Sequence, residues 1–173
     1  MAWYHLFVPD RVITNYLELT EAFLSEFNCR LLVMDLDNTL VAYNVERADD
    51  NVKGFIDYTK QAGYQIAIVS NNSKDRVSLF VADLDVKYYA KACKPLPGVY
   101  KRIMKDFGCK MDEIVFVGDQ LLTDVLGAKL VKGKVIWSKP LVEKDLFVTK
   151  FNRRWERMIY RLLLKKGLIS DEV

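Results

Sequence analysis

The 173-residue chain has little of what marks several special classes of protein. It has three widely spaced cysteines without a CxxC pair and a single histidine, so neither a disulfide framework nor a zinc site is indicated. Eight glycines and four prolines exclude a collagen-like or linker-type polymer. No apolar run approaches the roughly 18–20 residues that cross a bilayer. The first residues lack the pattern of a signal peptide, so we expect a soluble, cytoplasmic protein.

The composition is that of a globular domain, with 51% hydrophobic and 28% charged residues. The charges are unevenly distributed. Residues 150–166 hold seven of the 26 basic side chains and one of the 23 acidic ones, which leaves a net charge of −3 on the rest. This asymmetry predicts that the C-terminal segment contacts something anionic.

Short apolar segments alternate with segments of helical character. The sequence predicts strands at 30–35, 64–70, 87–91, 113–118 and 134–137, and helices at 10–27, 51–63, 74–84, 97–107 and 122–131. Buried strands that alternate with helices predict an α/β fold, in which a parallel sheet is covered by helices on both faces. Ligands of such sheets bind beyond the carboxyl ends of the strands.

The candidate catalytic and ligand-binding residues follow these predicted strands. Asp35, Asp37 and Thr39 come after the first, Ser70 and Asn71 after the second, and Lys94, Asp119 and Asp124 after later ones. Carboxylates two residues apart at a strand end repel each other unless a cation lies between them. Oxygen ligands without histidine or cysteine suit Mg²⁺. The plainer alternative, in which the two acids only cap a turn and a helix, does not account for the other residues.

The segments DLDNTLV, VSNN, a lone Lys-Pro and VGDQLLTD resemble the four motifs of the haloacid dehalogenase phosphatase superfamily, over residues 30–137. DLDNTLVAYN with GDQLLTDVLGA is more narrowly similar to YqeG-type phosphatases of subfamily IIIA, a group similar to phosphatidylglycerophosphate phosphatases. The resemblance implies a three-layer α/β/α sandwich. It also implies a Mg²⁺-dependent phosphomonoester hydrolase.

The resemblance implies a role for each motif residue. Asp35 is the expected nucleophile, and Asp37 the general acid and base, whose backbone carbonyl also binds Mg²⁺. Thr39 orders their loop. The phosphoryl group is bound by Ser70, Asn71 and Lys94, and the metal by Asp119 and Asp124 together with Asp35.

The intervals between the motifs are too short for a cap domain, so we expect an open site. The sequence predicts three parts, namely an N-terminal helical extension (1–29), a catalytic domain (30–140) and a basic amphipathic C-terminal helix (141–173). That helix either lies on an anionic membrane or packs on the domain; no motif favours a nucleic acid.

The substrate is open at this level. Phosphatidylglycerophosphate is the first candidate, on the family resemblance and the basic C-terminal segment. Soluble sugar phosphates, nucleotides and phosphoproteins are the alternatives, and homo-oligomerisation is compatible with the sequence. A module that binds a phosphate or a partner with little catalysis is the alternative from another class.

Overall fold

A computed structural model describes residues 2–142 and 149–170. Its centre is a six-stranded sheet in the order β1-β6-β5-β2-β3-β4, and all its strand pairs are parallel. The strands are β1 (Arg11–Ile13), β2 (Leu31–Met34), β3 (Gln65–Val69), β4 (Lys87–Tyr89), β5 (Ile114–Gly118) and β6 (Lys134–Ser138). The predicted α/β fold with a parallel sheet is confirmed.

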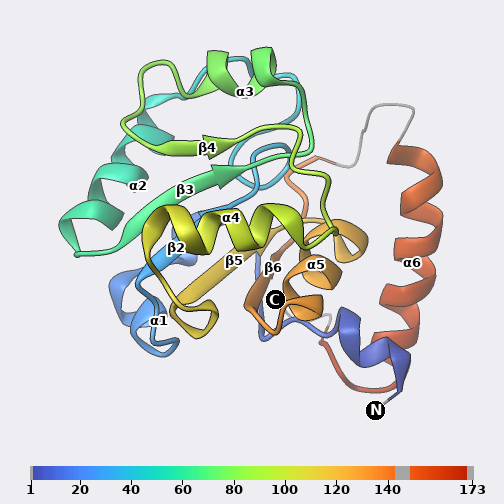
Figure 1. The fold of residues 1–173 in the computed structure, drawn as a ribbon. Helices are drawn as coiled ribbons and strands as arrows, with labels where there is room; N and C mark the ends of the chain where they lie inside the picture. Colours follow the sequence, from blue (N-terminus) through green and yellow to red (C-terminus); the bar gives the residue numbers. More distant parts are fainter. Residues whose placement is uncertain (1, 143–148, 171–173) are drawn as a thin grey trace.

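Helices cover both faces of this sheet (Figure 1). The helices are α1 (Glu21–Ser25), α2 (Asp50–Gln61), α3 (Lys74–Phe80), α4 (Gly98–Phe107), α5 (Leu126–Leu130) and α6 (Thr149–Lys165). Side-chain oxygens of Thr20, Asp49 and Ser73 accept backbone N–H groups at the starts of α1, α2 and α3. Helix α4 ends at Gly108, whose φ of 60° is the left-handed conformation that glycine adopts without strain.

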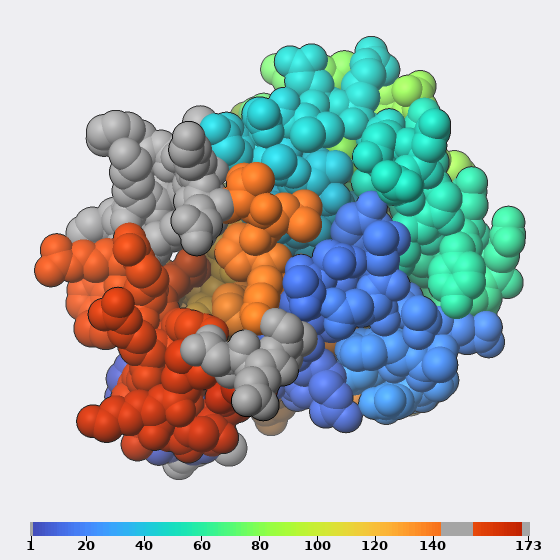
Figure 2. Space-filling view, turned by 180° about the vertical axis from the view of Figure 1, so that it is seen from behind, coloured from blue at the N-terminus to red at the C-terminus, as the bar shows by residue number. Residues whose placement is uncertain are grey.

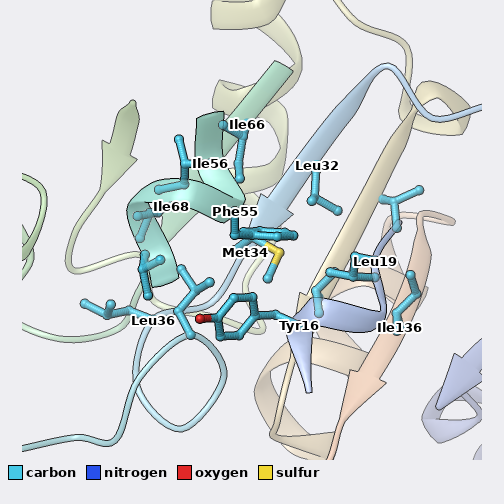
Figure 3. Packing of buried hydrophobic residues seen from close by; sticks show 14 of the residues in the cluster. Tyr16, Leu19, Leu32, Met34, Leu36, Phe55, Ile56, Ile66, Ile68 and Ile136 are labelled. Atoms are coloured by element: carbon cyan, nitrogen blue, oxygen red, sulfur yellow. The ribbon is translucent and has the colours of Figure 1, made fainter. Parts of the chain in front are cut away.

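Two hydrophobic cores lie between the sheet and its helices, because successive strand residues point to opposite faces. Leu32 and Met34 of β2 pack towards α2, beside Phe55 (Figure 3). Leu31 and Val33 pack into the other core, with residues of α4, α5 and α6. A central strand that is buried on both faces is therefore an uninterrupted apolar run.

The helix predicted over residues 10–27 is wrong. This segment forms β1, a 3₁₀ turn at Tyr16–Glu18 and the five-residue helix α1. The carboxylate of Asp10 accepts the backbone N–H of Val135, a residue of β6, at 2.7 Å. Strand β1 thereby extends the sheet beyond β6, so residues before 29 contribute to the central layer. The three-part division of the chain stays a prediction.

Helix α6 packs on the rest of the molecule (Figure 1). Ile159 and Leu163 are buried, and Lys166 lies 4.6 Å above the ring of Tyr4. Beside these buried residues, α6 exposes Trp155 and Met158, at 49% and 52%, among arginines. The side chains of Lys150, Phe151 and Arg153, which the sequence places on this helix, lie outside the described residues.

The intervals between the strands that carry the motifs are short. Only α2 and β3 lie between Thr39 and Ser70, and only α3 and β4 between Ser70 and Lys94, all within the described part of the chain. This agrees with the expected lack of a cap domain. Among the described residues, no helix is both long and apolar enough to cross a membrane.

Candidate active site

The candidate site lies where the order of strands reverses. From β2 the chain moves to β3 and β4 on one side, and then to β5, β6 on the other. The carboxyl ends of β2 and β5 are neighbours at this switch point, where open parallel sheets bind their ligands. Asp35 directly follows β2 and its backbone N–H donates to Val117 of β5 at 2.8 Å. Asp119 directly follows β5.

Three carboxylates meet at this point. One oxygen from each of Asp35, Asp119 and Asp124 lies within 4.8 Å of the others, and all three residues are buried. Burial raises the pKa of Asp35 to about 7; Lys94 opposes this shift and the charge of Asp124 adds to it. A group of buried carboxylates requires cations close by, because their charges are removed from water.

Lys94 supplies one of these cations. Its Nζ lies 2.6 Å from Asp35 Oδ1 and 2.6 Å from Asp124 Oδ1, and its side chain is only 3% exposed. Burial alone would lower the pKa of Lys94, but the carboxylates of Asp124 and Asp35 raise it above its ordinary value. Lys94 is therefore charged at neutral pH.

Ser70 and Asn71 shape the loop beside Lys94. Asn71 holds the backbone of Lys94 at both sides, since its Oδ1 accepts the Lys94 N–H at 2.7 Å and its Nδ2 donates to the Lys94 carbonyl at 3.1 Å. The hydroxyl of Ser70 accepts the N–H of Asn72 at 3.0 Å. Asn71 thus positions Lys94 in this structure. Phosphate binding by Ser70, Asn71 and Lys94 stays a prediction.

Asp124 reaches the site from a π-helical turn, Leu121–Val125, that continues into α5. Such turns are frequent at functional sites, since the extra residue re-aims a side chain. Its carboxylate packs against the backbone of Gly118: a methyl group there would lie 2.6 Å from both Cβ and Oδ2 of Asp124. Asp124 Oδ2 also accepts the N–H of Gln120 at 3.1 Å. The glycine therefore makes room for this carboxylate.

The carboxylate of Asp37 is not part of the three-carboxylate cluster, and two neighbouring side chains hold it. Its Oδ1 accepts from Arg76 Nη2 at 2.9 Å and its Oδ2 from Asn72 Nδ2 at 3.2 Å. Thr39 is buried, and its hydroxyl lies 3.4 Å from Asp35 Oδ2. The loop from 35 to 39 thus presents its two acids to different partners, one to Lys94 and one to α3.

The donor set of the three buried carboxylates fits a hard divalent cation. Ions of this kind bind carboxylate oxygens, and several such oxygens lie close enough here to share one ion. Asp35, Asp119 and Asp124 are therefore the side chains able to hold a metal. The predicted contribution of the Asp37 backbone carbonyl stays a prediction.

Comparison with known proteins agrees with this geometry. The family described as haloacid dehalogenase-like hydrolase matches residues 45–132. "Probable phosphatase YqeG" of Bacillus subtilis is 37% identical over 166 residues, which cover 96% of each chain. The chain belongs to the haloacid dehalogenase-like hydrolase family. The predicted class of enzyme, a hydrolase of this family, is confirmed.

Two further comparisons are more distant. "Phosphatidylglycerophosphate phosphatase 1, chloroplastic/mitochondrial" of Arabidopsis thaliana is 25% identical over 147 residues, and the aligned region covers 79% of this chain and 42% of that protein. The cobalt-bound deoxy-D-mannose-octulosonate 8-phosphate phosphatase of Haemophilus influenzae has a TM-score of 0.53 and 15% identity, over 83% of this chain and 94% of its own. This structural likeness concerns the fold alone.

Arg76 and Trp137 were missed from the sequence, and Asn72, which belongs to the segment VSNN, was given no role. Asn72 and Arg76 hold Asp37, and Trp137 Nε1 donates to the backbone carbonyl of Asp119 at 2.7 Å. A signal existed for Arg76, because the first turn of a helix that follows a parallel strand lies at the carboxyl edge of the sheet. Trp137 gave no signal, since tryptophan in a strand is most often core.

Proposed function

We propose that this protein is a Mg²⁺-dependent phosphomonoester hydrolase that acts through an aspartyl-phosphate on Asp35. The coarser statement, a hydrolase of the haloacid dehalogenase-like family, is established above. One observation carries the rest: Lys94 Nζ lies between Asp35 and Asp124 at 2.6 Å from each, inside a group of three buried carboxylates. A nucleophilic carboxylate approaches a phosphate dianion only where cations neutralise both.

In the first step an oxygen of Asp35 attacks phosphorus, and the bond from phosphorus to the alcohol oxygen breaks. Asp37 gives its proton to the leaving alkoxide. Lys94 holds Asp35 Oδ1, which fixes the direction of the carboxylate during attack. Asp35, Asp119 and Asp124 would hold a Mg²⁺ ion, which supplies positive charge for the phosphoryl oxygens.

In the second step Asp37 takes a proton from water, and this water attacks the phosphorus of the aspartyl-phosphate. Inorganic phosphate leaves and Asp35 is regenerated as a carboxylate. The proton that Asp37 gave in the first step is thereby returned, so the cycle balances. Asn72 and Arg76 bind both oxygens of Asp37 and keep this group beside the reacting atoms.

Phosphatidylglycerophosphate is the proposed substrate. Two observations support it. The Arabidopsis relative named above carries this substrate in its name, and α6 exposes Trp155 and Met158 among Arg154 and Arg161. A helix face of this composition suits peripheral contact with an anionic membrane surface, here at its cytoplasmic side.

The test is phosphate release from phosphatidylglycerophosphate in vesicles with Mg²⁺, and from para-nitrophenyl phosphate without vesicles. Asp35→Asn should abolish release from both, while Asp57→Asn, an exposed aspartate of α2, should retain it. Retained turnover in Asp35→Asn would refute the mechanism. Release from para-nitrophenyl phosphate alone would leave the mechanism standing and exclude the lipid.

A further inference from the structure

A pocket beside the metal-binding carboxylates is walled by the C-terminal helix. Its volume is about 450 Å³. We call it the α6 pocket; its described lining residues are Asp119, Leu121, Trp137, Pro140, Glu156, Arg157 and Tyr160. Asp119 is one of the three clustered carboxylates, so the pocket begins where the phosphoryl group would be bound.

We propose that the α6 pocket receives the alcohol portion of the substrate, and that Arg157 binds an anionic group on it. This inference rests on the proposed hydrolysis of phosphomonoesters and assigns a binding site to the rest of the substrate. The substrate carries, besides the phosphomonoester, a carbon skeleton and a second negative charge. Such a compound is a phosphorylated hydroxy acid or a phosphodiester-bearing alcohol.

The walls of the pocket are firmly held. The rings of Trp137 and Tyr160 lie 5.4 Å apart, and Trp137 Nε1 donates to the carbonyl of Asp119. Glu156 accepts the backbone N–H of Leu122 at 3.1 Å, which attaches α6 to the turn that carries Asp124. Figures 1 and 2 show α6 beside the body of the domain. A site without a cap domain thereby still has a side wall.

The chemistry of the lining gives the ligand class. Leu121 and Trp137 are buried apolar side chains that suit carbon atoms, whereas the lining residue Arg157 is exposed to solvent. A guanidinium binds carboxylate and phosphate in a two-pronged geometry. Arg157 also lines a second hollow with Arg154, Met158 and Arg161, so positive charge continues from the pocket onto the outer face of α6.

A matched pair of substrates tests the role of Arg157. Glycerol 2-phosphate and 2-phosphoglycerate differ only in a hydroxymethyl group that is replaced by a carboxylate. We expect kcat/KM to be about tenfold higher for 2-phosphoglycerate, the gain typical of one charged hydrogen bond at a partly exposed site. Arg157→Gln should remove this preference, and Lys165→Gln, an exposed change on the same helix, should keep it. Equal rates in the wild type, or a preference that survives Arg157→Gln, would overturn the proposal.

A binding measurement separates this inference from the hydrolysis itself. The chain has three tryptophans. NMR records the signals of their indole N–H groups, and the signal that is missing in Trp137→Phe is that of Trp137. In Asp35→Asn protein, 2-phosphoglycerate should shift the Trp137 signal further than inorganic phosphate does. This shift without hydrolysis by the wild type would refute only the proposed activity. Hydrolysis with a shift no larger than that from inorganic phosphate would refute only the pocket.

Discussion

Arg76 offers the sharpest test of how the acid and base is positioned. Its Nη2 donates to Asp37 Oδ1 at 2.9 Å, its Nη1 lies 3.4 Å from the carbonyl oxygen of Glu46, and its side chain is 15% exposed. A charged hydrogen bond of this kind contributes about 1.5–3 kcal/mol. If this energy holds Asp37 in its working orientation, its loss lowers the population of that orientation by about 10–100-fold.

The substitution is Arg76→Gln, with Arg102→Gln as the matched change at an arginine that is 71% exposed. The assay compares kcat/KM for an alkyl phosphate and for para-nitrophenyl phosphate. For each substrate, kcat/KM reports the steps up to formation of the aspartyl-phosphate. An alkoxide needs protonation as it leaves and nitrophenolate needs little, so Arg76→Gln should slow the alkyl phosphate about 10–100-fold and the aryl phosphate less than about threefold.

The comparison between the two substrates distinguishes positioning from folding. Arg76 also lies 5.6 Å from the ring centroid of Phe80, so its removal affects packing. A loss of folded protein lowers both rates by the same factor, whereas a misplaced acid lowers mainly one. Equal losses for both substrates, or no loss for the alkyl phosphate, would refute the assigned role. Arg76→Lys should restore part of the alkyl phosphate rate, because it keeps one charged donor.

Further predictions concern packing, pH and the thiols. Gly118→Ala should lower stability by about 1–3 kcal/mol and turnover at least tenfold, because the added methyl group meets the carboxylate of Asp124. Gly54→Ala, which has open space around it in α2, should raise stability by about 0.5–1 kcal/mol; urea denaturation measures both changes in stability. With EDTA present to remove metal ions, the free energy of unfolding should decrease as the pH rises from about 4 to 7, by at most about 4 kcal/mol. The reason is that folded Asp35 has a pKa of about 7 and keeps a proton that the unfolded chain releases. Asp35→Asn should remove this slope, and an unchanged slope would assign it to other groups. Exposed Cys93 should react rapidly with a chromogenic disulfide reagent at about pH 8. Burial raises the pKa of Cys29 to about 12, so this thiol should react only after unfolding; the released chromophore counts the thiols that have reacted.

The sheet was predictable because its strands are buried on both faces. Leu31–Met34 and Ile114–Gly118 are apolar runs, and each is followed directly by an aspartate. The same runs placed Asp35 and Asp119 correctly, since the residue after a parallel strand lies at the carboxyl edge whatever its partners are.

The segment before residue 29 was mistaken for one helix for a physical reason. Val12, Tyr16, Leu19 and Phe23 recur at helical spacing, yet Ile13 is fully buried in the sheet. Pairing with β6 decides this structure, and local spacing carries no information about a partner so distant in sequence. The contacts of Arg76 with Asp37 were hidden likewise, because they join residues 39 positions apart.

The parallel pairing of β1 with β6 has a consequence for synthesis of the chain. Asp10 and Val135, which are joined by a hydrogen bond, are 125 positions apart. At about 5–20 residues per second, the first strand waits on the order of ten seconds for its partner to leave the ribosome. During this interval Ile13 has no strand to pair with, because β6 does not yet exist. Strand β1 is therefore made before the strand that it pairs with, and it joins the sheet only after β6 has done so.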